Sequence, residues 1–296
     1  MPLLRALYSQ VKLPWGFTIR QKGTSAAQPT LILPPPTTVV GAFAYPLLRL
    51  LDVDVSSSGK KFHENEFRLI TPVLKHLLES TKVASASLHA GGEKSVGLAV
   101  HQEIGKLVTA PYRSGGSWEK ARKTKLFTDK FYKEGITQAL AVQAVGATYG
   151  PGAVLELLWV FDAEKLAKAL DVKIDALDEA AEKAVHGVVR VGSKEGLVAV
   201  LNDSTLYEKN VVQINAGVVG TRFYVEKKCV EPIERHAVAE ITMWDLTGKT
   251  ALFYVPAYLG SNNVLTPLPK GYTPNFILLE PCKAYKLSNN AVGVGV

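Results

Sequence analysis

The spacing of apolar residues along this chain alternates between the period of two that is typical of a strand and the longer period of a helix. Leu4, Ala6 and Tyr8 alternate within residues 3–13, which predicts a first strand. A helix over residues 37–48 and a short helix over residues 69–78 are expected next, followed by four strands over residues 82–89, 95–108, 138–149 and 153–161. A long helix over residues 162–189 and two short strands over residues 188–191 and 197–201 are expected after them. This order indicates an α+β fold, in which helices cover one face of an antiparallel sheet.

The strongest helical segment, residues 162–189, divides the chain into a mixed first part and a β-rich remainder. Asp162 is expected to be its N-cap, and its acidic residues are expected to face solvent. From residue 211 onward strands are predicted over residues 211–219, 222–230, 237–244 and 251–258.

The composition is that of an ordinary folded protein of 296 residues, with 47% hydrophobic and 21% charged residues. The longest uncharged stretch, residues 23–48, contains five prolines and is therefore no membrane span, and no signal peptide is recognisable. The two cysteines, Cys229 and Cys282, lie far apart without a CxxC partner, and the six histidines lack metal-ligand spacing. We therefore expect no metal site and a reduced, intracellular protein.

The formal net charge of +7 is concentrated in a few segments. Residues 1–51 contain five basic residues and no acidic one, and residues 113–133 contain seven basic residues against two acidic ones. Residues 162–186 carry the opposite balance, with seven acids and four lysines. This separation favours an anionic polymer as partner, and solvated lysines on loops are the alternative.

Three consecutive prolines, Pro34 to Pro36, precede the first predicted helix. Because proline fixes φ and lacks an N–H, this stretch should be extended and rigid. Thr37 or Thr38 is expected to be the N-cap, and Pro46 is expected to kink or split the helix. Two interpretations remain: a well-started core helix, or a helix N-terminus held in place to bind a phosphate.

Two segments interleave cations with aromatic residues, a pattern that suits single-stranded RNA because aromatic faces stack unpaired bases and cations contact phosphates. The candidate RNA-binding residues of the first segment are Lys12, Trp15, Phe17, Arg20 and Lys22, and those of the second are Arg113, Lys120, Arg122, Lys123 and Lys125. In the first segment the aromatic residues could instead anchor a loop onto the core. The second segment is interpreted either as a protruding arm or as a lid folded back on its own domain.

The stretch RVGSKEG, residues 190–196, contains the remaining candidates for RNA binding: Arg190, Gly192, Ser193 and Lys194. Its glycines would let the backbone approach an anion closely. A hairpin turn with surface charges is the alternative.

Together these features resemble one family: an early first strand, PPPTT opening the first helix, and RVGSKEG after the second helix. The chain is similar to the CRISPR-associated RAMP subunit, of the fifth Cas family, that holds the 5′ handle of the guide RNA in type I Cascade, with the archaeal type I-A branch nearest. The resemblance covers residues 1–205. It implies a ferredoxin-like (RRM-like) RNA-binding domain there, with a basic thumb inserted at residues 111–135, followed by a β-rich region over residues 206–296.

The resemblance further implies a cytoplasmic protein with no cofactor, no catalytic residue and no membrane contact. Its expected partners are the crRNA 5′ handle, the Cascade backbone subunit and the large and small subunits, with target DNA reached through the complex. One branch of the family, type I-C, instead cuts precursor RNA with a tyrosine, a lysine and a histidine. Tyr149, Lys94 and His89 are of the right types, but no motif brings them together. A subunit that contacts only protein is the third possibility.

Overall fold

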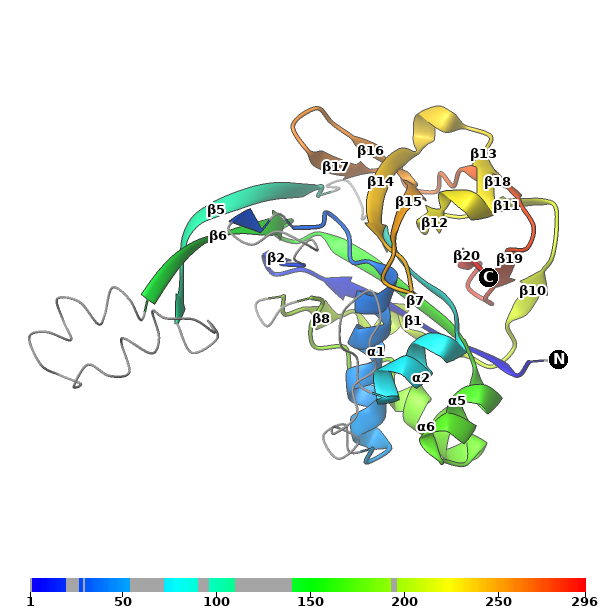
Figure 1. Cartoon of the computed structure of the whole chain (residues 1–296). Coiled ribbons are helices and arrows are strands. Elements are labelled where there is room, and N and C mark those ends of the chain that lie inside the picture. Colours follow the sequence, from blue (N-terminus) through cyan, green and yellow to red (C-terminus); the bar gives the residue numbers. More distant parts are fainter. Residues whose placement is uncertain are drawn as a thin grey trace, which may run out of the picture.

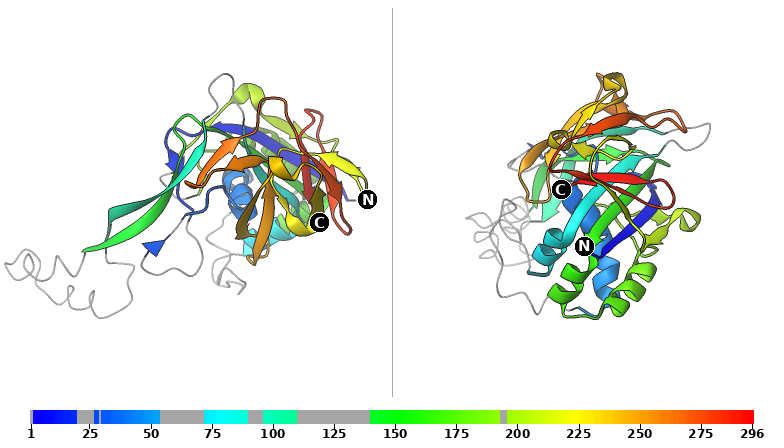
Figure 2. Two further views of the ribbon diagram at one scale, coloured as in Figure 1. Left: turned by 90° about the horizontal axis from the view of Figure 1, so that it is seen from above. Right: turned by 90° about the vertical axis from the view of Figure 1, so that its right-hand side faces the viewer.

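The computed structural model describes residues 2–19, 27–28, 30–53, 72–89, 96–109, 140–192 and 196–296, and for residues 27, 28, 72, 102–109 and 140–145 the backbone alone (Figure 1). A central antiparallel sheet carries helices on one face and strands of the C-terminal region on the other, and a long hairpin projects from the body (Figure 1, Figure 2). The predicted combination of helices with antiparallel sheets is confirmed.

Strand β1 (Leu4–Lys12) lies inside the central sheet and pairs antiparallel with β7 (Val154–Asp162) along its whole length. The far edge of β7 pairs with β4 (Thr81–Leu88). The other edge of β1 pairs with β8 (Ala199–Val200) and β9 (Leu206–Glu208), which gives the order β4-β7-β1-β8. The predicted first strand is therefore confirmed.

Four helices cover one face of this sheet: α1 (Pro36–Leu50), α2 (Pro72–Ser80), α5 (Ala163–Leu170) and α6 (Ile174–Ala184) (Figure 1). Leu7 and Val11 of β1 point to this face, because alternate residues of a strand share one side. Phe43 of α1 packs on Trp159 of β7 with 6.4 Å between ring centroids, and both side chains are fully buried. Burial of such aromatic rings is a large part of what stabilises the core.

Helix α1 begins earlier than predicted, and neither threonine is its N-cap. Pro35 is the N-cap residue and Pro36 the first helical residue, a position where the missing N–H costs nothing. The Thr37 hydroxyl instead accepts a hydrogen bond from Trp244 Nε1 at 3.0 Å. The helix also continues through Pro46, so it is not split there.

The long helical segment contains two helices rather than one. Asp162 is the N-cap of α5 as predicted, and its carboxylate accepts a hydrogen bond from the Lys165 N–H. Asp171 then adopts a left-handed conformation with φ of 55°, which ends α5 and lets the chain turn into α6.

The expectation that the acids of this segment face solvent is wrong for Asp178. Its carboxylate is buried and accepts two hydrogen bonds from the Arg5 guanidinium, at 2.9 and 3.0 Å, and one from the Tyr207 hydroxyl. Burial opposes ionisation of Asp178, but the bonds from Arg5 and Tyr207 outweigh it and lower its pKa. This pair joins α6 to β1 and β9.

The C-terminal region consists of short strands in small sheets. The first of these sheets has the strand order β12 (Val225–Glu226), β15 (Thr250–Val255), β14 (Ala239–Trp244). The second has the order β11 (Val218–Gly220), β18 (Asn275–Leu278), β13 (Val230–Pro232). The third has the order β10 (Val212–Ile214), β19 (Lys283–Lys286), β20 (Val292–Gly295). Phe223 and Tyr285 of this region pack on Tyr8 and Leu158, on the sheet face opposite the helices. The strand predicted over residues 237–244 is confirmed. Those predicted over residues 211–219 and 222–230 are too long.

The projecting hairpin consists of β5 (Leu98–Thr109) and β6 (Leu140–Tyr149). It belongs to a second sheet with β16 (Ala257–Leu259), β17 (Val264–Pro267), β2 (Gly16–Phe17) and β3 (Ala27–Gln28). The thumb predicted at residues 111–135 lies outside the described residues. No helix within the described ranges is long and apolar enough to span a membrane.

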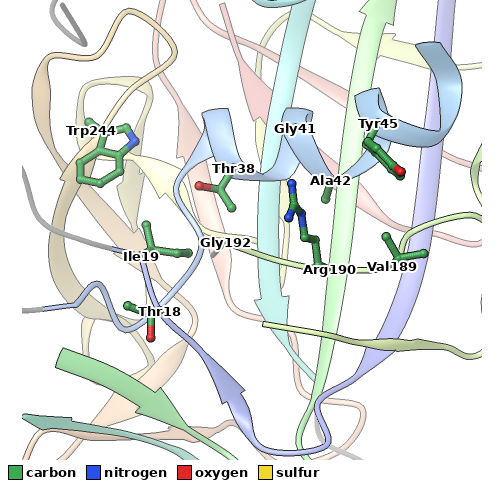
Figure 3. A pocket seen from close by; sticks show the side chains of 10 residues that line it. All are labelled: Thr18, Ile19, Thr38, Gly41, Ala42, Tyr45, Val189, Arg190, Gly192 and Trp244. Carbon is green, nitrogen blue, oxygen red and sulfur yellow. The ribbon is translucent and has the colours of Figure 1, made fainter. Parts of the chain in front are cut away.

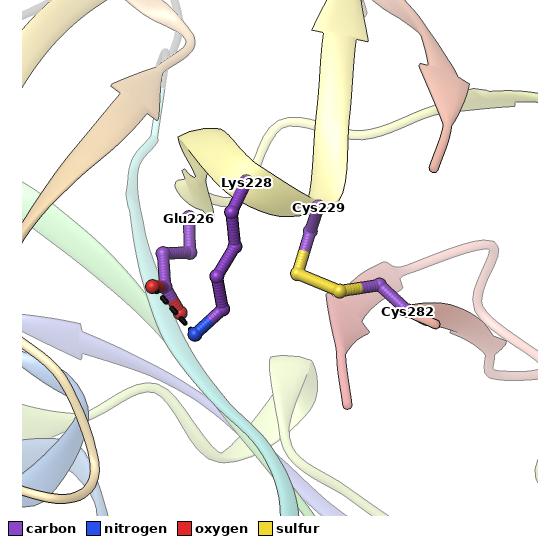
Figure 4. Close-up of a disulfide and its surroundings, with 4 residues drawn as sticks. All are labelled: Glu226, Lys228, Cys229 and Cys282. Carbon is purple, nitrogen blue, oxygen red and sulfur yellow. Dashed lines mark ion pairs between the residues drawn. A yellow bond between two sulfur atoms is a disulfide. The ribbon is translucent and has the colours of Figure 1, made fainter. Parts of the chain in front are cut away.

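Cys229 and Cys282 form a disulfide, so the expectation of reduced thiols is wrong (Figure 4). Their Cα atoms are 5.3 Å apart although 53 residues separate them in the sequence. Both side chains lie in the C-terminal core, and an ion pair between Lys228 and Glu226 of 2.7 Å lies beside them. Because disulfides also occur inside the cells of hyperthermophiles, this bond does not decide the compartment.

We expect Asp178→Asn to lower the free energy of unfolding at neutral pH by about 3 kcal/mol, because it leaves the Arg5 charge buried without a counter-charge. Since the folded state lowers the pKa of Asp178, the pair stabilises the protein above the pKa of the unfolded carboxyl, and this stabilisation is lost as the pH falls through the folded pKa. Urea unfolding at several pH values should show the variant and the parent converging in acid.

The matched control is Glu179→Gln, one residue further along α6. Glu179 is exposed and pairs with Lys183 on its own helix, so this change should leave the free energy of unfolding nearly unchanged. Equal losses in the two variants would contradict the structural role given to Asp178.

Candidate nucleic-acid interface

A cavity of about 480 Å³ lies where three of the sequence segments singled out above meet (Figure 3). Its walls come from the first turns of α1, the residues after β2, residues 189–192 and the end of β14. The lining residues are Thr18, Ile19, Thr38, Gly41, Ala42, Tyr45, Val189, Arg190, Gly192 and Trp244. Among the described residues that line it are a cation and two aromatic rings but no acid, so this part of the cavity suits a ligand that is both anionic and flat.

The α1 wall of the cavity consists of Thr38, Gly41, Ala42 and Tyr45. These residues are three and four apart in the sequence and therefore share one face of the helix. A Cβ atom added at Gly41 would meet nothing within 4 Å, and the Tyr45 side chain is 52% exposed. The helix therefore presents a groove with an aromatic ring at one end.

The opposite wall is the hairpin that contains RVGSKEG. The Val191 N–H donates to the Gly196 carbonyl at 2.8 Å and Arg190 bridges to Leu197, so the stretch is a hairpin turn, as the alternative held. Arg190 is exposed, and its side chain points toward α1 (Figure 3). This cation is the charge that the hairpin contributes to the cavity.

Gly192 has a role within the chain that the sequence did not reveal. Its φ is +78°, and a Cβ atom there would lie 2.7 Å from the Thr18 carbonyl oxygen and from the Ile19 side chain. The glycine thus lets the hairpin approach residues 18 and 19. The close approach predicted at this position exists, but its partner is the protein's own backbone.

Trp244 is the lining residue that sequence reasoning missed. It ends β14, more than 200 residues from Thr37, and its indole N–H donates to the Thr37 hydroxyl. A tryptophan at the end of a predicted strand was the available signal, but nothing local connects it to α1. The hydrogen bond fixes the indole orientation at one side of the cavity.

The other predicted site residues fall into three groups. Thr38 lines the cavity beside Thr37, Lys12 is exposed at the end of β1, and Trp15 is 73% exposed in the turn that follows. Phe17 is only 3% exposed and belongs to the core, so its ring cannot stack a base in this conformation and instead anchors the loop. Outside the described residues lie Arg20, Lys22, Arg113, Lys120, Arg122, Lys123, Lys125, Ser193 and Lys194.

A second polar cluster surrounds Glu156 of β7, whose side chain is fully buried. Its carboxylate accepts hydrogen bonds from Tyr8, Gln10 and His89 at 2.7, 3.0 and 3.0 Å, and from Arg222. Burial alone would raise the pKa of Glu156, but the bonds from His89, Arg222 and Tyr8 outweigh it and lower it to about 2. Burial, with Glu156 nearby, raises the pKa of Tyr8 to about 12.

The structure describes two of the three residues considered for RNA cleavage, and each has its own neighbours. His89 belongs to the Glu156 cluster, whereas Tyr149 packs near His101 with 6.3 Å between ring centroids. Lys94 lies outside the described residues. In the part of the chain that the structure describes, no group of three or more His, Cys, Asp or Glu residues could hold a metal ion.

Two archaeal proteins are similar to most of this chain. They are the CRISPR-associated protein Cas5 3 and the CRISPR system aCascade subunit Cas5 1, both of Saccharolobus solfataricus. Each is 24% identical over 244 and 245 residues respectively, which is 82% of this chain and 81% of the relative. No family model matches the chain.

A solved structure matches nearly the whole chain: a CRISPR protein from Archaeoglobus fulgidus, with a TM-score of 0.56, 18% identity and coverage of 98% of both chains. The fold is therefore one found among CRISPR-associated proteins. More particularly, the chain is similar in sequence to archaeal Cas5 proteins. This confirms the family resemblance seen in the sequence.

We expect Gly192→Ala to destabilise the protein by about 3 kcal/mol, because alanine there is strained by the positive φ and also clashes with the Thr18 carbonyl. Gly152→Ala is the matched control. Gly152 has a similar φ of +82°, but nothing lies within 4 Å of an added Cβ atom, so the loss should be about 1 kcal/mol. Urea unfolding measures both, and a Gly192 loss no larger than the Gly152 loss would contradict the contact between the hairpin and residues 18 and 19.

Proposed function

We propose that this chain binds the 5′ handle of a CRISPR guide RNA and caps one end of a type I interference complex, without cutting RNA. The observation that carries the proposal is the cavity of Figure 3, whose described lining combines Arg190 with two aromatic rings and contains no acidic side chain. Exposed Trp15 and Lys12 offer a further stacking face and a cation. Single-stranded RNA needs both kinds of contact.

The order of elements supports a ferredoxin-like, RRM-like domain over residues 1–205. Strand β1, helix α1, strands β4 and β7, helices α5 and α6, and β8 follow the order of a βαββαβ unit, and the sheet order β4-β7-β1-β8 agrees with it. Residues 206–296 would then be the separate β-rich region. The β5–β6 hairpin, inserted between β4 and β7, would carry the thumb of residues 111–135.

The names of the relatives support the proposed partners. One relative is named as a subunit of aCascade, so this chain would contact the Cascade backbone subunit and the large and small subunits, and would reach target DNA through the complex. We propose that this assembly acts in the cytoplasm.

We expect the full chain to bind handle RNA with an affinity that falls steeply with salt, and Arg190→Ala to weaken binding roughly threefold to tenfold. Loss of one phosphate contact should also reduce the slope of log K against log salt by about 0.7. Lys168→Ala on α5 is the control, since Lys168 is exposed but lines no part of the cavity. Fluorescence anisotropy over a salt series measures each value. A flat salt response, or an Arg190 variant that behaves as the parent, would overturn the proposal.

A second candidate function, metal-independent cleavage of precursor guide RNA, is favoured by the Glu156 cluster. Because the Glu156 carboxylate accepts from His89 Nδ1, the other ring nitrogen, Nε2, is the one left to act on a 2′-hydroxyl. We expect no discrete product when the chain is incubated with precursor RNA in EDTA. A product that His89→Ala abolishes would replace the binding role by an enzymatic one.

A further inference from the structure

Gly41 is a glycine that the fold does not require. Glycine is less favourable than alanine inside a helix, so Gly41 lowers the stability of α1. Other glycines are required by the fold: an added Cβ would clash at Gly187 and Gly192, and φ is positive at Gly152 and Gly217. Among the glycines whose surroundings are described, Gly41 alone combines an ordinary φ with empty space around the added Cβ.

The empty space at Gly41 is the floor of the cavity. Tyr45 lies one helical turn further along and is half exposed, and Trp244 stands at the other side with its indole held by Thr37 (Figure 3). Trp244 and Tyr45 lie at different parts of the α1 wall, because the indole is bonded to Thr37, eight residues and therefore about 12 Å along the helix axis from Tyr45. The absence of a side chain at residue 41 leaves open the helix surface beside the Tyr45 ring.

The chemistry of the cavity selects a nucleobase over an aliphatic side chain of a protein partner. Aromatic rings stack on the flat face of any base, and Arg190 in the cavity wall can contact the phosphate attached to it. The Thr38 hydroxyl and the Thr18 backbone add polar groups at the walls. The volume of about 480 Å³ lies within the range of pockets that hold small ligands.

We propose that one unpaired base of the bound RNA leaves the strand and enters this cavity, over Gly41 and beside the Tyr45 ring, with its phosphate at Arg190. This inference rests on the proposed function and deepens it. It moves the point of recognition from the N-terminus of α1 to the side of the helix, one turn further along.

The test fills the cavity above residue 41 with a side chain of the protein itself. Gly41→Leu adds a side chain whose Cβ atom has nothing within 4 Å, and leucine is a better helix former than glycine, so thermal unfolding should show a stability equal to or above that of the parent. Gly41→Ala fills the cavity only in part. Ala176→Leu, on the exposed surface of α6, controls for adding a leucine to a helix away from the cavity.

The RNA side of the test is a handle RNA in which each nucleotide in turn is made abasic. With the parent protein we expect one position at which removal of the base weakens binding roughly tenfold. With Gly41→Leu, binding of the intact RNA should be weaker by a similar factor, and removal of that base should have no further effect. Ala176→Leu should keep the parent pattern, and Gly41→Ala should lie between the two.

The outcomes separate the inference from the proposed function. If the parent binds no RNA at low salt, the proposed function fails. If the parent binds but Gly41→Leu has the same abasic profile as the parent, the base pocket is wrong while RNA binding stands. A uniform loss at all positions in Gly41→Leu would likewise overturn the pocket, because it would mean that the leucine disturbs the surface as a whole.

Discussion

The antiparallel ladder between β1 and β7 is the interaction on which the rest of the structure depends. It runs from Leu4 opposite Asp162 to Lys12 opposite Val154 without a register shift. A shift by one residue would exchange the two faces of the sheet, and both faces are buried, one under helices and one under the C-terminal region. The same register places Arg5 where it meets Asp178 of α6, and Tyr8 where it meets Glu156. Each of these buried carboxylates is ionised only because its partners come from other segments.

The ladder also determines where the cavity forms. β1 ends at Lys12, and the chain then turns through Trp15 and Gly16 into residues 18 and 19, which form one wall. Residues 189–192 return from α6 along the same side, and Gly192 lets them close on Thr18. The cavity is therefore built from connections between elements whose ends the central sheet holds. A scaffold of this kind positions loops well, which is why binding residues are often found on loops.

What the sequence predicted correctly was local. The first strand follows from the alternation of apolar residues. The Asp162 cap follows from the position of its carboxylate, three residues before the Lys165 N–H from which it accepts a hydrogen bond. The failures are contacts between distant segments: Asp178 is buried because Arg5 reaches it, Thr37 is bonded to Trp244 instead of capping its own helix, and Cys229 meets Cys282. The sequence predicted a close backbone approach at Gly192, and in the structure the Thr18 carbonyl and the Ile19 side chain lie close to this residue. The sequence therefore predicted the segments that line the cavity. It did not predict that these segments meet, nor that Trp244 forms one of the walls.

The three prolines at the start of α1, Pro34 to Pro36, are explained by the same C-terminal region that contributes Trp244. Residues 34–36 are buried, and a buried peptide group must find partners for its N–H and its carbonyl. Prolines bring no N–H, so only carbonyls remain to be satisfied. The Pro34 carbonyl accepts from the Tyr224 hydroxyl at 2.9 Å, and the Pro35 carbonyl accepts from the N–H groups of the first helical turn. Tyr224 and Trp244 together fix the start of α1 against the C-terminal region. Because Gly41 and Tyr45 follow on the same helix, the C-terminal region fixes the geometry of the proposed base pocket as well as supplying one of its walls.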